Sequence, residues 1–335
     1  MRRIKAAIVA SDVSGIVVSG VAGVGKSRIA REALSAAASR GNATHWAVGS
    51  SSARALPLGA FTAWAQTGVT DPGQLVRGVI ESLTAAPAGA RVVVGVDDVQ
   101  LLDDLSTFVV HQLVQRAAAK VVLTVRDGEP IPAAVQEIWK GGQFEWLDLQ
   151  PLSPDETTTL LSAALGGAMD PQATRRLWKL TRGNALYLRN IVEQEVADGR
   201  LDMRQGQWQW IGDPMMPRGL VELIESRIGA LPTAVSDVID VLAVGEPIEL
   251  AALRRITDPD AVEEAETRGL ITLDHLGTTI EVRVAHPLYG QVRRKRAPRT
   301  RLRRLRGLVA TELAATDQRD DIRVVVRRAT LSLDS

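Results

Sequence analysis

Short apolar runs and helix-like segments alternate along residues 1–150. The valine-rich run 91–96 is typical of a strand that is buried on both faces. Helices are predicted over 27–38 and 102–119. Strands that alternate with helices predict a parallel sheet covered by helices on both sides. The predicted strands are 16–19, 44–48, 91–96, 120–125 and 145–149, the last as a candidate edge strand.

Helical patterns predominate after Pro151. Trp208 and Trp210 alternate with polar residues around Gln205-Gly206, which predicts a small hairpin. A second hairpin is predicted around a turn at 275–277. The predicted helices are 154–165, 171–181, 184–197, 218–229, 232–243, 250–257 and 261–268, and the strands of the second hairpin are 270–273 and 280–284. Successive helices followed by a hairpin are the order of a winged helix, and the chain is again helical beyond Pro298.

Composition narrows the class of protein. The chain has 335 residues, 45% of them apolar, and a formal net charge of +1, which is ordinary for a globular protein of two or three domains. It has no cysteine, which excludes disulfides and thiolate metal sites. We find no signal peptide and no apolar stretch long enough to span a membrane, so we expect a cytoplasmic protein with no membrane partner.

One segment carries a complete chemical motif. Gly20-Val-Ala-Gly-Val-Gly-Lys26-Ser27 matches G-x-x-x-x-G-K-[ST] between a predicted strand and a predicted helix, which is the P-loop context. Glycines let backbone N–H groups wrap around phosphate oxygens at the start of a helix. Lys26 would bind the β- and γ-phosphates and Ser27 would bind Mg²⁺. The alternative is a glycine turn that matches by coincidence. The predicted phosphate-binding residues are Gly20, Gly23, Val24, Gly25, Lys26, Ser27 and Arg28.

Two acids follow the buried strand 91–96. Asp97 would hold Mg²⁺ through water, and Asp98 would polarise the attacking water. The alternative for this pair is a helix N-cap, because aspartate also favours that position. Arg126 ends the next strand and is a candidate γ-phosphate sensor, or else a solvated loop arginine. We therefore predict Lys26, Asp98 and Arg126 as catalytic residues, and Ser27 and Asp97 as metal ligands. No N-K-x-D signature for guanine occurs, which favours ATP and ADP as ligands.

These residues together resemble the STAND branch of AAA+-like ATPases and, more narrowly, the ATPase module of large LuxR-family transcriptional regulators of actinobacterial type. The resemblance covers nearly the whole chain. Its motifs are GVAGVGKSRIARE at 20–32, LPLGAF at 56–61, VVVGVDDVQLLDD at 92–104, VVLTVRD at 121–127, LQPLSPDE at 149–156, TRGNALYLRNIV at 181–192, LVELIESRIGALP at 220–232 and AHPLYGQV at 285–292.

The resemblance implies an α/β P-loop NTPase domain with an AAA+/STAND-like parallel sheet, followed by a helical lid and a winged-helix domain. The implied domains are a nucleotide-binding domain at 1–150, the lid at 151–215, a winged-helix-like domain at 216–297 and the start of a helical arm at 298–335. In such proteins a G-N-P motif of the lid lies near the nucleotide. Ala185 replaces its proline here.

The resemblance also implies a switch. His286 matches a histidine that senses the β-phosphate in the resting, diphosphate-bound form, although a satisfied core histidine is equally compatible with the sequence. Family members begin with a G-R-x-x-E element and end in a helix-turn-helix domain. This chain starts at Met1 and stops at Ser335 without either, so we expect a fragment or a shortened relative. DNA would then be a partner through a domain absent from this chain, and ATP binding would promote self-association.

Nine basic residues lie within 293–306. They could form a nucleic-acid patch through counterion release, or a solvated linker and helix face. We favour the linker and helix face, because charge runs are usually solvated. No aromatic residue interleaves the run, so stacking on single-stranded nucleic acid is not supported. Three functions stay open for the whole chain. One is a slowly hydrolysing ATP-dependent regulatory switch, the second is an AAA+ motor that remodels DNA, and the third is an ATP-binding module without hydrolysis.

Overall fold

The structure is a computed structural model. It describes residues 1–66, 68–69, 71–140, 142–212, 215–277 and 279–315. Of the arm predicted at 298–335, the part after residue 315 lies outside the described residues. The chain divides into two compact units, Met1–Pro151 and Leu152–Ser335. This division lies next to the boundary predicted at residue 150. The further division into lid, winged helix and arm stays a prediction.

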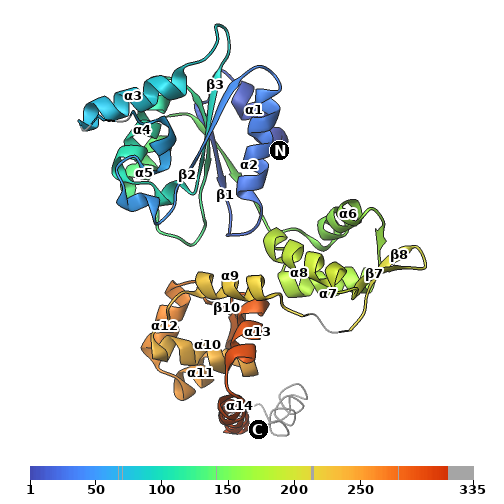
Figure 1. Cartoon of the computed structure of the whole chain (residues 1–335). Helices are drawn as coiled ribbons and strands as arrows, with labels where there is room; N and C mark the ends of the chain where they lie inside the picture. The colour runs from blue at the N-terminus through green and yellow to red at the C-terminus, as the bar shows by residue number, and fades with distance from the viewer. Residues whose placement is uncertain (67, 70, 141, 213–214, 278, 316–335) are drawn as a thin grey trace. The chain divides into compact units, whose positions relative to one another are not determined.

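The first unit is built on a five-stranded parallel sheet with the order β2-β3-β4-β1-β5 (Figure 1). Its strands are β1 (Gly15–Ser19), β2 (Ala43–Val48), β3 (Val92–Asp97), β4 (Lys120–Thr124) and β5 (Phe144–Asp148). All five predicted strands are present, and the prediction of an edge strand at 145–149 is confirmed. Strands β1 and β3 are buried along their whole length, as their continuous apolar runs require.

Helices cover both faces of this sheet (Figure 1). They are α1 (Arg2–Val9), α2 (Lys26–Ala38), α3 (Pro72–Thr84), α4 (Asp104–Gln115) and α5 (Ala133–Lys140), with short 3₁₀ turns η1 (Ala53–Ala55), η2 (Gly59–Trp64) and η3 (Val99–Leu101). Alternate residues of β1 serve the two faces, because side chains alternate along a strand. Ile16 and Val18 pack with α1 and α2, whereas Val17 packs with the residues of α3, α4 and α5.

The single helix predicted over 102–119 is wrong at both ends. Helix α4 begins at Asp104, because the carboxylate of Asp103 accepts the N–H of Ser106 and caps it. It ends at Gln115, and Ala117 takes a positive φ of 48° before β4. Helices α1, α3 and α5 were not predicted. Helices α1 and α5 have only eight residues each, whereas α3 has thirteen and begins with an Asp71 cap and Pro72, which are helix-start signals.

The second unit is mainly helical. Its helices are α6 (Pro154–Leu165), α7 (Pro171–Thr181), α8 (Ala185–Ala197), α9 (Arg218–Ile228), α10 (Thr233–Gly245), α11 (Leu250–Ile256), α12 (Pro259–Thr267), α13 (Pro287–Arg296) and α14 (Arg299–Ala315). Its strands are β6 (Ala168–Met169), β7 (Leu201–Arg204), β8 (Gln207–Trp210), β9 (Ile248–Glu249), β10 (Ile271–Leu276) and β11 (Thr279–Val284). They form two three-stranded sheets, β6-β8-β7 and β10-β11-β9.

Side-chain caps explain why α6, α7 and α8 begin where the sequence predicts. Ser153 and Glu156 form a capping box at the start of α6. Asp170 and Asn184 each accept a backbone N–H in the first turn of α7 and α8. Proline occupies the first turn of α6 and of α7, where its missing N–H costs nothing.

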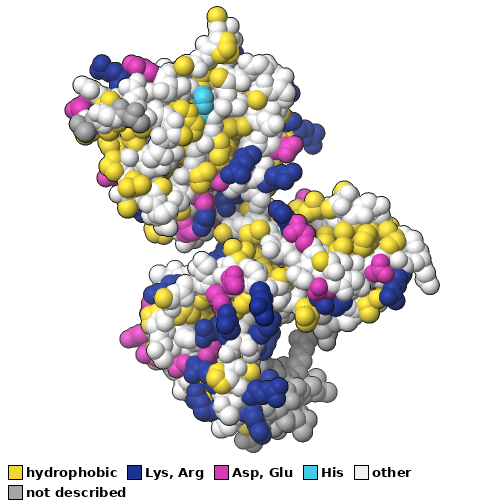
Figure 2. All heavy atoms as spheres, in the orientation of Figure 1, with side chains coloured by type: hydrophobic (Ala, Val, Ile, Leu, Met, Phe, Trp, Pro, Cys, Tyr) yellow, Lys and Arg dark blue, Asp and Glu magenta, His cyan; other side chains and the backbone are white. Residues whose placement is uncertain are grey.

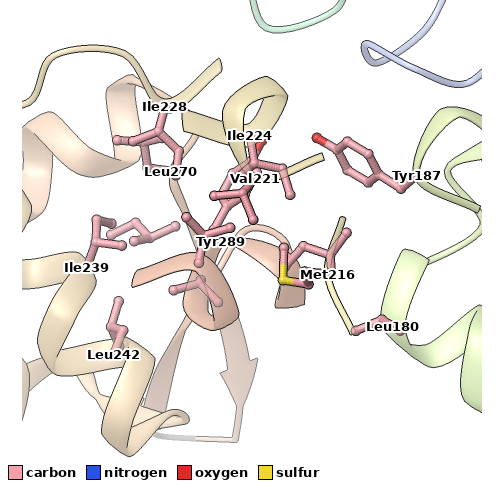
Figure 3. Close-up of a cluster of buried hydrophobic side chains, with 14 of the residues drawn as sticks. Leu180, Tyr187, Met216, Val221, Ile224, Ile228, Ile239, Leu242, Leu270 and Tyr289 are labelled. Carbon is pink, nitrogen blue, oxygen red and sulfur yellow. The ribbon is translucent and has the colours of Figure 1, made fainter. Parts of the chain in front are cut away.

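One hydrophobic cluster extends from α6 to α14 within the second unit. Figure 3 shows part of it, with Tyr187 of α8 and Tyr289 of α13 among aliphatic side chains such as Ile224 of α9. Both hairpins are present, but the predicted turn at 275–277 is too early: His275 and Leu276 belong to β10, and the turn is at Gly277, which has a φ of 62°. Helix α13 was not predicted as a separate helix.

Candidate nucleotide site

The loop between β1 and α2 has the backbone of a phosphate cradle. Gly20, Gly23 and Gly25 have φ angles of 147°, 87° and 109°, a region that residues with a Cβ rarely adopt. At Gly20 a Cβ would also lie 2.5 Å from the carbonyl oxygen of Leu149. Gly25 is the N-cap of α2, and no side chain caps that helix. The first N–H groups of α2 are therefore oriented as an anion-binding helix terminus.

Lys26 lies beneath this loop and is 5% exposed. Its Nζ donates to the carbonyl oxygens of Gly20 at 2.7 Å and Val21 at 3.0 Å. Burial lowers the pKa of Lys26, while the nearby carboxylates of Asp98, Asp127 and Asp97 oppose that shift. The ammonium group is thus held in the cradle by the loop's own backbone and is partly desolvated, which strengthens its attraction to an anion.

Ser27 and Asp97 meet although they are 70 residues apart in the chain. The hydroxyl of Ser27 donates to Oδ1 of Asp97 at 2.8 Å, and Asp97 is 6% exposed at the carboxyl end of β3. A hydroxyl and a carboxylate are hard oxygen donors that fit Mg²⁺. The described residues contain no group of three or more His, Asp or Glu side chains that could hold a metal ion alone.

Asp98 and Arg126 form a bidentate ion pair. Nε and Nη2 of Arg126 donate to the two carboxylate oxygens of Asp98 at 2.9 and 2.5 Å, and Nη1 donates to Glu129 at 3.2 Å. The hydrogen bond to Asp98 raises the pKa of Arg126. Arg126 is therefore not a free loop arginine, and the carboxylate of Asp98 is neutralised by a partner in this structure.

The remaining predicted phosphate-loop residues lie at the edge of the cradle. Val24 is 6% exposed and packs against Gly20. Arg28 points into solvent, with a side chain that is 85% exposed and 3.7 Å from Glu32 on the next turn. The structure thus brings together Lys26, Ser27, Asp97, Asp98 and Arg126 in one place, whereas Arg28 does not join them.

His286, in the second unit, is engaged at both nitrogens. Nε2 lies 2.9 Å from the carbonyl oxygen of Thr181, at the end of α7, and Nδ1 accepts the N–H of Leu288 at 3.2 Å, which caps α13. A carbonyl only accepts, so Nε2 carries the hydrogen and the imidazole is neutral. Burial lowers its pKa to about 4, and the charges of Arg227 and Arg182 act in the same direction.

Several members of the basic run 293–306 are used inside the second unit. Asp240 of α10 is 3% exposed, and it accepts from Arg293 at 2.6 Å and from Arg301 at 2.9 Å. Arg296 pairs with a glutamate of α9 at 2.6 Å. A buried carboxylate requires such partners. Figure 2 shows acidic side chains among the Lys and Arg side chains visible on this unit. These contacts favour a helix face over a continuous nucleic-acid patch.

Two residues next to the acids were missed by the sequence patterns. Thr124, the last residue of β4, donates to Oδ1 of Asp97 at 2.5 Å and accepts the N–H of Asp98 at 2.9 Å. Gly49 follows β2, and a Cβ there would lie 2.4 Å from the carbonyl oxygen of Asp98. The only sequence signal was their position at the carboxyl ends of predicted parallel strands, where ligands of such sheets bind.

The chain was compared with known proteins. No protein-family model and no curated protein sequence matches it. Among solved structures it is similar to a Walker-type ATPase of Pyrococcus abyssi, with 12% identity, a TM-score of 0.51 and coverage of 88% of this chain and 94% of that chain. This likeness, together with the five-stranded parallel sheet and its flanking helices, shows a P-loop NTPase fold.

Two other similar structures have lower TM-scores. A STAND protein with a tetratricopeptide-repeat sensor from Pyrococcus horikoshii is 19% identical, with a TM-score of 0.38 and coverage of 99% of this chain. This chain spans 47% of that protein's length. The Orc1 protein of Aeropyrum pernix, solved in complex with DNA, is 15% identical, with a TM-score of 0.48 and coverage of 90% of this chain and 92% of that chain. No helix among the described residues is both long and apolar enough to cross a membrane.

Proposed function

We propose that this chain is an ATP-binding module that hydrolyses ATP slowly and serves as a regulatory switch. The observation that carries the proposal is the meeting of Lys26, Ser27 and Asp97 at one open helix terminus. Lys26 and Ser27 come from the P-loop after β1, and Asp97 comes from the end of β3, which is separated from β1 by β4. Together they supply a cation, a hydroxyl and a carboxylate where a triphosphate with its metal ion would lie.

Each side chain would have a separate task. The backbone N–H groups of the loop and the ammonium group of Lys26 would bind the β- and γ-phosphates. Ser27 and Asp97 would hold Mg²⁺, which neutralises charge on the phosphate oxygens when bound. Asp98 would orient and polarise the attacking water after Arg126 releases its carboxylate. Arg126, once released, would be free to bind the γ-phosphate. Because the ion pair must break before water can be polarised, turnover should be slow.

Calorimetry of the full chain with ATP and Mg²⁺ tests this proposal. We expect one binding site per chain, competition by ADP, and weak competition by GTP. Steady-state phosphate release should be slow and should not respond to DNA. Turnover of many per second that rises with added DNA would instead favour an AAA+ motor, and lack of ATP binding would refute the assignment of the site.

The ion pair between Asp98 and Arg126 specifically favours a second candidate, an ATP-binding module that does not hydrolyse. A carboxylate that stays paired cannot polarise water. Phosphate release by the wild type, compared with an Asp98→Ala variant, separates the two candidates. Equal background rates favour the non-hydrolysing module.

The wider role is proposed on the resemblance to LuxR-family regulators. The helices α10, α11 and α12, followed by the β10-β11 hairpin, have the order of a winged helix, and α6, α7 and α8 have the order of a lid. In this proposal the module is cytoplasmic, ATP binding promotes self-association, and DNA is bound by a domain outside this chain. A transcription assay with the full-length gene product and its Lys26→Ala variant tests the regulatory role.

A further inference from the structure

Thr124 is a fully buried residue at the carboxyl end of β4. A threonine hydroxyl has one hydrogen to donate and lone pairs to accept with. Here the hydrogen goes to Oδ1 of Asp97, at 2.5 Å, and a lone pair accepts the backbone N–H of Asp98, at 2.9 Å. One hydroxyl therefore holds the side chain of the first acid and the backbone of the second.

Asp98 needs such support because its backbone is strained. It has φ 50° and ψ 55°, in the left-handed region, which is unfavourable for a residue with a Cβ. Such conformations persist where surrounding contacts hold them, and they concentrate at functional sites. Thr124 holds the N–H of Asp98. Gly49 leaves room for its carbonyl oxygen, which accepts the N–H of Leu101 at 2.9 Å.

The same hydroxyl also affects Asp97 and Ser27. Ser27 donates to the oxygen of Asp97 that receives the Thr124 hydrogen. That oxygen thus has two donors, which fix the rotation of the carboxylate and leave its second oxygen without a hydrogen bond from either hydroxyl. The branched side chain of a threonine in a strand has few χ1 rotamers, so the hydroxyl is itself well placed.

We propose that Thr124 is a positioning residue for the acid pair: it orients Asp97 toward the metal ion and holds Asp98 at the angle needed to polarise water. This inference rests on the proposed ATP-binding function. The competing explanation is that the hydroxyl only satisfies buried polar groups and affects stability alone.

Three variants of the full chain distinguish these explanations. Thr124→Val keeps the shape and removes the hydroxyl, and Thr124→Ser keeps the hydroxyl. Thr157→Val is the matched control, because Thr157 is also fully buried and its hydroxyl has no hydrogen-bond partner among the described residues. The readouts are ATP affinity by calorimetry with and without Mg²⁺, kcat and KM for phosphate release, and the urea unfolding midpoint.

We expect Thr124→Val to bind ATP without Mg²⁺ within about threefold of the wild type, because Lys26 and the loop backbone are intact. Its gain in affinity from Mg²⁺ and its kcat should each fall by about tenfold to a hundredfold, the effect of losing a hydrogen bond to a charged group. Thr124→Ser should keep both within about threefold, and Thr157→Val should match the wild type in every readout except stability.

Unchanged Mg²⁺ dependence and kcat in Thr124→Val would overturn the inference, and so would equal losses in the Val and Ser variants. If the Val variant does not fold, Thr124→Ala removes the same hydroxyl without added bulk, and wild-type values in that variant overturn the inference. Failure of the proposed function is recognised separately, because the wild type itself would then not bind ATP. If the wild type binds but does not hydrolyse, the Mg²⁺ dependence alone decides.

Discussion

The P-loop in the first unit and His286 in the second were both predicted as nucleotide contacts, but their hydrogen-bonding surroundings in the structure differ. Around the P-loop, Lys26 and Ser27 lie at an uncapped helix terminus that is suited to an anion. His286 is occupied at both nitrogens by Thr181 and Leu288. The hydrogen bond from His286 Nε2 to the carbonyl oxygen of Thr181 joins α13 to α7. A phosphate contact by Nε2 would require this hydrogen bond to break.

The difference shows what a motif contributes beyond a single residue. The P-loop has several residues whose spacing, strand and helix together permit one geometry. A lone histidine adopts whatever role its surroundings allow, and here burial and two hydrogen bonds keep the imidazole neutral at the start of α13.

The largest effect is expected for Lys26→Ala. Removing the buried ammonium group from the cradle should weaken ATP binding by at least about a hundredfold, because charge-assisted phosphate contacts are strong. Calorimetry of the full chain measures this. Lys140→Ala is the control, because Lys140 is exposed and pairs with the exposed Glu137. Equal ATP affinity in the two variants would remove the P-loop from the proposed site.

Asp98→Asn should lower kcat for phosphate release by about a hundredfold, in the range of lost general-base assistance, while ATP affinity changes by less than about threefold. The amide cannot polarise water as the carboxylate does. Asp104→Asn, at an exposed position in the first turn of α4, serves as the control in the same phosphate-release assay. A rate unchanged by Asp98→Asn would favour the non-hydrolysing module.

His286→Ala should destabilise the folded chain by about 2 kcal/mol, through loss of the α13 cap and of the bond to Thr181. His286→Asn can still cap the helix but cannot reach Thr181 in the same way, so its loss should be about 1 kcal/mol. Urea denaturation gives both values, and ADP affinity is measured in parallel. A tenfold loss of ADP affinity with unchanged stability would establish instead that His286 contacts the diphosphate, as the resemblance implies.

The smallest effect is a pH dependence. The pKa of His286 is about 4 when folded, below its ordinary value of 6.5, so the unfolded chain binds the proton more readily. Its contribution to stability is therefore fully present above pH 6.5 and declines as the pH falls toward 4. Between about pH 6.5 and about pH 5.5 the free energy of unfolding should fall by about 1 kcal/mol. Burial also lowers the pKa of His45, so the test compares wild type with His286→Asn. NMR titration of the imidazole checks the pKa, and a value near 6.5 would contradict the buried neutral state.

The central strands β3, β4 and β1 were predictable because a strand buried on both faces demands a continuous apolar run, whereas the edge strands β2 and β5 are mixed and only partly buried. Local chemistry also placed the starts of α6, α7 and α8, since their caps are side chains within three residues of the helix. Helix α1 has only eight residues, and its N-cap, Met1, provides no capping side chain, so it has neither the length nor the start signal of a typical helix. Helix α13 is capped by a histidine, which is not a usual cap residue.

From the amino-acid order alone one could read the P-loop, the acids that follow the buried strand, and the parallel sheet between them, because each depends on neighbours a few residues away. Tertiary structure decided how these parts meet. It joined Ser27 to Asp97, paired Asp98 with Arg126, and introduced Thr124 between the acids. These contacts depend on which strands lie side by side and on the depth of burial, and both are properties of the packed sheet that no local pattern specifies.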